Sequence, residues 1–245
     1  MKLEACDLRF SIEDKVILNR INFYIESSEI VSIIGPNGAG KTTLLKCLNC
    51  VLADFKGKII LDGKDIKDCS RKTISKKVGL MQQEFHSIYD YKVFEIIEMG
   101  RYLSDISPKK FEQIITYLNF HNLLNCYIND ISTGERQLTQ IAMILYQDPA
   151  IFLLDEPVSH LDPYYRRIII RTIRDLKLQG KLVISIFHDI NTALHISDRI
   201  LVLDTGEVKF FGTPGELLQT TILETVFRSK PAIFQEQDRF FVDFF

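Results

Sequence analysis

Residues 35–42 read Gly-Pro-Asn-Gly-Ala-Gly-Lys-Thr and fit the pattern G-x-x-x-x-G-K-[ST]. The pattern follows an apolar run at residues 30–34 and leads into a predicted helix at residues 43–48. Its glycines let backbone N–H groups point inward, where they and the helix start attract phosphate oxygens. A glycine-rich turn without a ligand is the alternative, but the preceding strand and following helix favour a phosphate site. Its candidate residues are Gly35, Pro36, Asn37, Gly38, Ala39, Gly40, Lys41, Thr42 and Thr43.

Two side chains at the end of this loop supply charge and metal coordination. Lys41 can place a positive charge on the β- and γ-phosphates of a nucleotide. Thr42 is suited to donate its hydroxyl oxygen to Mg²⁺, a hard cation that prefers oxygen ligands and keeps several waters. The loop therefore predicts a nucleoside triphosphate bound together with Mg²⁺.

The pair Asp155 and Glu156 follows a wholly apolar run at residues 151–154. Open α/β sheets bind ligands at the carboxyl ends of their strands, which is where these two carboxylates stand. Asp155 can hold magnesium through its water shell, and Glu156 can polarise the attacking water as a general base. An adjacent Asp-Glu pair is usually a solvated turn, so the catalytic interpretation depends on the phosphate loop upstream.

These side chains need a sheet to position them, and short β-branched runs between helical stretches predict one. The runs are residues 30–34, 58–61, 78–81, 151–154, 182–186 and 200–203. Their alternation with helical patterns indicates an α/β domain. Runs 151–154 and 182–186 are apolar on both alternating faces, as strands covered on both sides of a mostly parallel sheet must be. They are predicted to be central strands.

Between residues 84 and 147 the strand pattern stops, and apolar residues recur at three- and four-residue spacing. The recurring residues are Phe111, Ile114, Ile115 and Leu118, and later Leu138, Ile141, Ala142 and Leu145. Pro108 suits the first turn of a helix, and Asp148 before Pro149 closes the segment because the residue before proline avoids helical geometry. We expect a single domain whose core, about residues 1–84 and 148–245, holds an inserted helical subdomain at about residues 85–147.

Composition narrows the classes of function. The 245 residues carry a net charge of -2 without a block of one sign, so nucleic acid is a poor partner. No secretory signal is visible, and no apolar run reaches the roughly 18 residues of a membrane helix. The five cysteines are odd in number and scattered, so reduced thiols are expected, with Cys47 and Cys50 on one helical face rather than forming a redox or metal pair. If the protein serves transport, another chain must form the pore.

Residues 131–135, Ile-Ser-Thr-Gly-Glu, together with the phosphate loop and the Leu-Leu-Asp-Glu-Pro run at residues 153–157, resemble the ABC ATPase family. The signature sequence of that family is usually Leu-Ser-Gly-Gly-Gln or Leu-Ser-Gly-Gly-Glu. The resemblance implies that the Ser132 hydroxyl and the Gly134 backbone meet the γ-phosphate of ATP held by the opposite subunit, with the start of a helix facing it. The signature residues are then Ser132, Thr133, Gly134 and Glu135. Thr133 replaces the usual first glycine, and its side chain could crowd the nucleotide or weaken dimer closure.

Further residues match the family in its usual order. Gln83 resembles the glutamine that reaches magnesium and faces the membrane partner, although Gln82 stands where a proline is common. Ser159 and Asp162 resemble the loop that crosses the dimer interface, and His188 resembles the histidine that contacts the γ-phosphate. The implied catalytic residues are Glu156, His188 and Gln83, and the implied magnesium ligands are Thr42, Gln83 and Asp155.

Phe10 resembles the aromatic residue that stacks on adenine, since a flat π-face suffices for that contact. A phenylalanine packed in the core of the first strand is the alternative. The chain holds 17 phenylalanines, so no single one is distinguished by its type.

The resemblance covers nearly the whole chain and implies a P-loop NTPase (RecA-like) core with a mostly parallel sheet, an antiparallel β subdomain and an inserted α-helical subdomain. Segments 187–194, 197–200 and 206–216 look like the ATPases of metal-chelate importers for ferric siderophores, haem or cobalamin. Implied are Mg·ATP hydrolysis by a head-to-tail dimer of two copies, import through a separate membrane permease, and a substrate-binding protein that supplies the cargo. The expected location is cytoplasmic, peripheral on the cytoplasmic face of the cell membrane. The alternatives are a soluble ABC ATPase for iron–sulfur cluster assembly and a degenerate scaffolding subunit.

Overall fold

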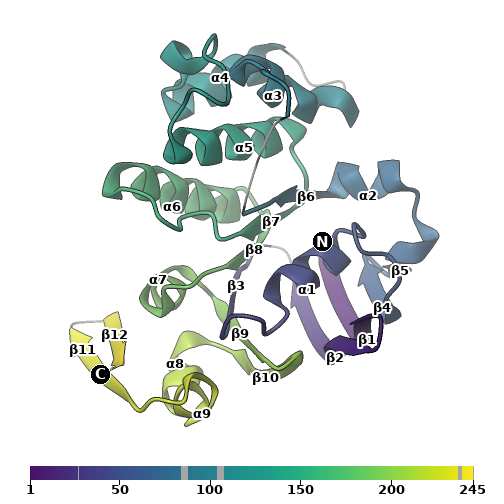
Figure 1. The fold of residues 1–245 in the computed structure, drawn as a ribbon, viewed down its shortest axis with the longest axis vertical. Coiled ribbons are helices and arrows are strands. Elements are labelled where there is room, and N and C mark those ends of the chain that lie inside the picture. The colour runs from purple at the N-terminus through teal and green to yellow at the C-terminus, as the bar shows by residue number, and fades with distance from the viewer. Residues whose placement is uncertain (27, 84–87, 104–107, 237–238, 245) are drawn as a thin grey trace.

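The computed structural model describes residues 1–26, 28–83, 88–103, 108–236 and 239–244, and a six-stranded sheet lies at its centre (Figure 1). The strands follow the order β10-β9-β3-β8-β7-β6. Their bounds are β3 Ile30–Ile34, β6 Val78–Met81, β7 Ile151–Asp155, β8 Leu182–Ile186, β9 Arg199–Asp204 and β10 Glu207–Gly212. Neighbouring strands run parallel except β9 and β10. The predicted α/β fold with a mostly parallel sheet is therefore confirmed.

The inner strands are apolar on both faces because each face covers a separate hydrophobic core. In β3, Ile30 and Ile34 join one buried cluster, whereas Val31 and Ile33 join the other. Every residue of β3, β7 and β8 is buried. The two runs predicted to be central strands, residues 151–154 and 182–186, correspond to β7 and β8, which pair with each other inside the sheet.

A second sheet is antiparallel and has the strand order β2-β1-β4-β5. Its strands are β1 Lys2–Ile12, β2 Lys15–Glu26, β4 Lys56–Leu61 and β5 Lys64–Asp65. The register of β1 against β2 shifts between Ala5 and Leu8 and again between Leu8 and Phe10. Such bulges interrupt strict alternation in β1, whereas Ile21, Phe23 and Ile25 of β2 alternate with exposed residues. Of this sheet, the predicted runs include only residues 58–61. The antiparallel β subdomain that the resemblance implies is confirmed.

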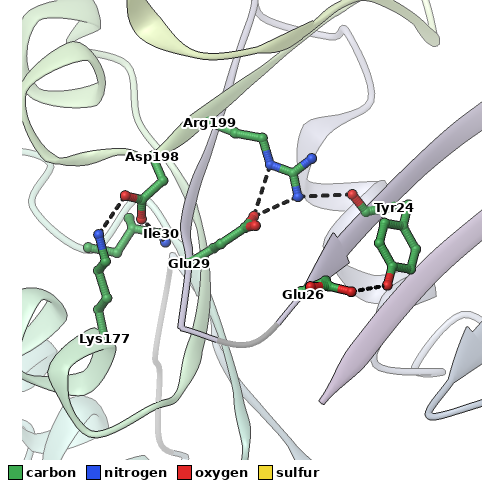
Figure 2. Close-up of polar contacts among 7 residues, drawn as sticks. All are labelled: Tyr24, Glu26, Glu29, Ile30, Lys177, Asp198 and Arg199. Carbon is green, nitrogen blue, oxygen red and sulfur yellow. Dashed lines mark hydrogen bonds and ion pairs between the residues drawn. The ribbon is translucent and has the colours of Figure 1, made fainter.

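A set of polar contacts ties this antiparallel sheet to the central one (Figure 2). Arg199, the first residue of β9, forms an ion pair of 2.6 Å with Glu29 and donates a hydrogen bond of 3.0 Å to the Tyr24 carbonyl oxygen. Its neighbour Asp198 pairs with Lys177 at 2.5 Å and accepts the Ile30 N–H at 2.8 Å. These contacts hold the start of β3, and hence the strand that leads to the phosphate loop.

The chain between β6 and β7 forms helices that lie on the far side of α6 from most of the core (Figure 1). These are α3 Val93–Met99, α4 Pro108–Leu118 and α5 Thr133–Gln147, with short 3-10 turns η2 Gly100–Leu103 and η3 His121–Leu123. The described residues of this segment also form one isolated bridge, between Lys92 and Tyr127. Helix α5 ends before Asp148, which has a φ of 56° and is followed by Pro149. The subdomain limits at about residues 85 and 147 stay a prediction, and residues 85–87 lie outside the described residues.

The remaining helices flank the sheets, and a hairpin ends the chain (Figure 1). The elements are α1 Lys41–Leu48, η1 Ile66–Asp68, α2 Arg71–Lys77, α6 Pro163–Leu178, α7 Ile190–Ile196, α8 Pro214–Leu218, α9 Ile222–Phe227, β11 Pro231–Glu236 and β12 Arg239–Phe244. Among the described helices, none is both long and apolar enough to span a membrane. Cys47 lies on α1, but Cys50 lies beyond its end with a φ of 57°, so the prediction that both share one helical face was wrong. Both thiols are buried and free.

Candidate active site

The loop between β3 and α1 has a backbone that only glycine accommodates at two points. Gly35 has a φ of 151°, and a Cβ atom there would stand 1.9 Å from the Leu203 carbonyl oxygen. Gly40 has a φ of 99°, and a Cβ atom would stand 2.9 Å from the side chain of Leu18. Helix α1 begins directly after Gly40. The glycines of the predicted phosphate loop thus allow a close turn into a helix N-terminus.

Lys41 lies inside this loop, with 7% of its surface exposed. Its Nζ donates hydrogen bonds to the carbonyl oxygens of Gly35 at 2.8 Å and Pro36 at 2.9 Å. Burial lowers the pKa of Lys41, and the nearby charges of Glu156 and Asp155 oppose that change. The loop therefore encloses a cation whose charged form would gain from a bound anion.

Thr42 and Asp155 bring two oxygen donors together. The Thr42 hydroxyl donates a hydrogen bond of 3.3 Å to Asp155 Oδ1, which joins the start of α1 to the end of β7. Asp155 is 3% exposed, and burial raises its pKa, against the opposing effects of the Thr42 hydrogen bond and of the nearby lysines. A buried carboxylate beside a hydroxyl is a donor set that fits Mg²⁺, which prefers oxygen ligands and keeps part of its water shell.

Glu156 is the point at which three other predicted residues meet. Its Oε2 atom accepts hydrogen bonds from Gln83 Nε2 at 2.7 Å and from the Ser159 hydroxyl at 3.1 Å. Its Oε1 atom lies 2.5 Å from His188 Nε2. Gln83, Glu156 and His188 follow β6, β7 and β8, which are neighbours in the sheet. Parallel strands carry their carboxyl ends to the same edge, so sheet order brings these side chains together.

A cleft of about 310 Å³ lies beside Glu156 and the phosphate loop. Its described lining comprises Lys15, Ile17, Asn37, Gly38, Ala39, Gly40, Lys41, Thr42, Thr43 and Glu156. Lys15 and Ile17 lie at the start of β2 and were not predicted, because no motif marks them; their alternation on an edge strand is the only signal. Phe10 lies in β1 with 7% exposure, packed in the core, and is not among the described lining residues. Its contact with adenine stays a prediction.

The signature residues begin helix α5 and are not among the described residues that line the cleft. Ser132 is the N-cap: its hydroxyl oxygen accepts the Glu135 N–H at 3.3 Å, and Glu135 Oε2 accepts the Ser132 N–H at 2.8 Å. Thr133 is exposed, whereas Gly134 is buried. This capping box leaves the helix N-terminus and the Thr133 side chain at the surface.

The loop that begins at Ser159 ends in helix α6. Asp162 is the N-cap of that helix, and its Oδ1 atom accepts the N–H groups of Tyr164 at 2.8 Å and Tyr165 at 3.2 Å. Ser159 instead contacts Glu156 within the same chain. The two predicted interface residues therefore border the active site at one end and the start of α6 at the other.

Comparison with known proteins identifies the family to which this chain belongs. A family model described as ABC transporter matches residues 18–159. These residues include the phosphate loop, the signature, Glu156 and two of its contacts, Gln83 and Ser159. The chain belongs to the ABC transporter family. It is an ABC ATPase, the ATP-binding subunit of such a transporter.

The similar proteins agree with this assignment over most of their length. An ABC transporter ATP-binding protein of Methanocaldococcus jannaschii is 36% identical over 215 residues, 85% of this chain and 84% of that protein. A petrobactin import ATP-binding protein of Bacillus anthracis is 32% identical and covers 94% of this chain and 88% of its own. A hemin import ATP-binding protein of Rhodopseudomonas palustris is also 32% identical, with 93% and 87% coverage.

Solved structures share the fold of this ABC ATPase. One described as an inward-facing, metal-chelate type ABC transporter has a TM-score of 0.81 and 26% identity, covering 99% of this chain and 96% of that chain. Another, cbiO1 of Clostridium perfringens, has a TM-score of 0.77 and 25% identity, covering 91% and 93%. The P-loop NTPase core that the resemblance implies is confirmed.

Proposed function

We propose that two copies of this ABC ATPase join head to tail and hydrolyse Mg·ATP at sites shared between them. The observation that carries the proposal is that the signature lies apart from the phosphate loop of the same chain. The cleft holds Lys41, Thr42 and Glu156, whereas no described lining residue comes from the signature. Ser132 and the N-terminus of α5, whose dipole would attract an anion, are not among the described residues that line the cleft over the chain's own phosphate loop. A second copy supplies the loop it lacks.

The residues of the proposed site divide the chemistry. Lys41 and the backbone N–H groups of the loop bind the phosphates, and Thr42 and Asp155 hold Mg²⁺. Magnesium, when bound, neutralises charge on the phosphate oxygens. Glu156 accepts a proton from the attacking water, while Gln83 and His188 orient the carboxylate from either side. The partner's Ser132 and Gly134 stabilise the γ-phosphate from the opposite side of the nucleotide.

The relatives support a proposal for the cargo and the partners. Petrobactin and hemin import proteins cover most of this chain at 32% identity, and a metal-chelate type transporter covers 99% of it. We therefore propose that the dimer docks on a separate membrane permease at the cytoplasmic face and drives import of an iron chelate, a siderophore complex or haem. A substrate-binding protein delivers the cargo to the permease.

Mixing two inactive variants tests the shared site. Lys41→Ala removes the phosphate-loop charge and Ser132→Ala removes the signature hydroxyl, so a mixed dimer retains one composite site free of both changes. We expect ATPase activity per protein to rise well above that of either variant alone. If proven mixed dimers gain no activity, the site is not shared in this way.

Growth on iron sources tests the cargo. In a strain that lacks the gene, growth on a ferric siderophore or on haem under iron limitation should fail and return with the wild-type chain. Lys41→Ala, which cannot bind nucleotide, should not restore it. Equal growth with and without the gene on both iron sources would contradict iron-chelate import while leaving the ATPase proposal intact.

A further inference from the structure

The first turn of α6 carries two consecutive side chains that reach in different directions. This turn is held by Asp162 at its N-cap and directly follows the loop of Ser159. Tyr165 contacts the signature segment, whereas Arg166 contacts the segment that follows His188. One helix end therefore touches both the signature segment, which we propose acts on the partner's nucleotide, and the segment beside His188, which contacts Glu156 of the chain's own site.

Tyr165 supports the signature. A Cβ atom on Gly134 would stand 2.6 Å from the Tyr165 ring, so the ring packs directly on the glycine. Burial and the charge of Glu135 raise the pKa of the Tyr165 hydroxyl, so this hydroxyl lies near the capping box that Ser132 and Glu135 form. Tyr164 packs edge-on against the same ring, with centroids 5.2 Å apart. This ring fills the space that Gly134 leaves open and limits where the Ser132 turn can lie.

Arg166 supports the histidine loop. Its guanidinium forms an ion pair of 2.5 Å with Asp189 and a hydrogen bond with the Thr192 hydroxyl. Asp189 directly follows His188 and caps α7 by accepting the Asn191 N–H at 3.1 Å. The Arg166 and Asp189 side chains are each 44% exposed, so the pair contributes little to overall stability and more to the position of the loop.

We propose that Tyr165 and Arg166 are positioning residues for opposite ATP sites of the dimer. Tyr165 positions the signature that acts on the nucleotide of the partner. Arg166 positions His188, which orients Glu156 beside the nucleotide bound by its own phosphate loop. The proposal rests on the shared sites described above and adds that neighbouring residues on one helix serve different sites.

This assignment places the two residues in opposite complementation groups. A Tyr165 variant has an intact phosphate loop and a displaced signature, so it should behave like Ser132→Ala. An Arg166 variant has an intact signature and a displaced His188, so it should behave like Lys41→Ala. A residue that merely stabilises the fold belongs to neither group.

The experiment mixes full-length variants in pairs and measures ATPase activity per protein. Tyr165→Leu and Arg166→Gln alone should each lose about tenfold, because small misplacement of a reacting group is costly. Tyr165→Leu should recover about threefold with Lys41→Ala but not with Ser132→Ala, since about half of randomly formed dimers are mixed and each has one intact site. Arg166→Gln should recover with Ser132→Ala but not with Lys41→Ala. Arg167→Gln, the same change at the next exposed position, should keep wild-type activity.

The outcomes distinguish a failure of this proposal from a failure of the shared-site proposal on which it rests. If Lys41→Ala and Ser132→Ala do not complement each other, the shared site itself fails and this proposal falls with it. If that reference pair complements but either α6 variant retains full activity, recovers with both partners, or shows the reversed pattern, only the α6 assignment is overturned. An unfolded variant would also recover with neither partner. Tyr165→Phe and Arg166→Lys, which keep the ring and the charge, are therefore mixed with the same two partners as conservative variants. Recovery with neither partner by all four folded variants also overturns the assignment.

Discussion

Glu156→Gln is expected to lower the rate of ATP hydrolysis by about a hundredfold or more while leaving Mg·ATP binding intact. Glutamine has the same size and can still accept the hydrogen bonds that Gln83 and Ser159 donate to this position. It has no carboxylate to take a proton from water. The residues proposed to bind the phosphates and magnesium, Lys41, Thr42 and Asp155, are unchanged. Single-turnover hydrolysis and nucleotide titration measure the two effects separately.

The same variant should make the dimer visible. Because ATP bound between two copies is not consumed, size-exclusion chromatography with Mg·ATP should show a dimer for Glu156→Gln, whereas the wild type returns to a monomer as ATP is hydrolysed. The exposed Thr133 makes this a demanding test, since it begins α5, the helix end that the proposed dimer places against the partner's nucleotide. Wild-type hydrolysis in the variant would remove Glu156 from the catalytic role. Lost hydrolysis without a dimer would instead indicate that Thr133 weakens closure of the dimer. Adding Thr133→Gly to Glu156→Gln should then restore the dimer.

Lys41→Ala is expected to abolish detectable ATP binding, and hydrolysis with it. Lys41 is 7% exposed and its ammonium is held by two loop carbonyl oxygens, so it meets a bound phosphate with little competing water. Removing one partner of such a buried charge pair costs about 2–5 kcal/mol, or roughly thirtyfold to several thousandfold in affinity. Isothermal titration with Mg·ATP measures the loss.

Two controls make that result specific. Lys76→Ala removes an exposed lysine from α2 and should bind nucleotide like the wild type. Thermal unfolding without nucleotide should show that Lys41→Ala remains folded, because the change removes a charge whose burial is unfavourable. Wild-type affinity in folded Lys41→Ala would show that the loop is not the nucleotide site.

Features that depend on neighbours along the chain were predictable from the sequence. The apolar runs at residues 30–34 and 182–186 match β3 and β8, since a strand covered on both faces needs apolar residues on both. Pro108 begins α4 as expected, because proline suits the first turn of a helix. Strands β1 and β2 were not among the predicted runs: bulges interrupt the alternation of β1, but Ile21, Phe23 and Ile25 of β2 alternate with exposed residues and were overlooked.

The sequence by itself determined the α/β class, the phosphate loop and the acidic pair at the end of β7, because each is encoded within one strand–loop unit. Only the tertiary structure decided which side chains meet Glu156. Gln83 lies 73 positions away and His188 32 positions away, and the order β8-β7-β6 places them on either side of it. The contact of Tyr165 with Gly134 was equally hidden, because it joins two helix ends whose packing no local pattern records.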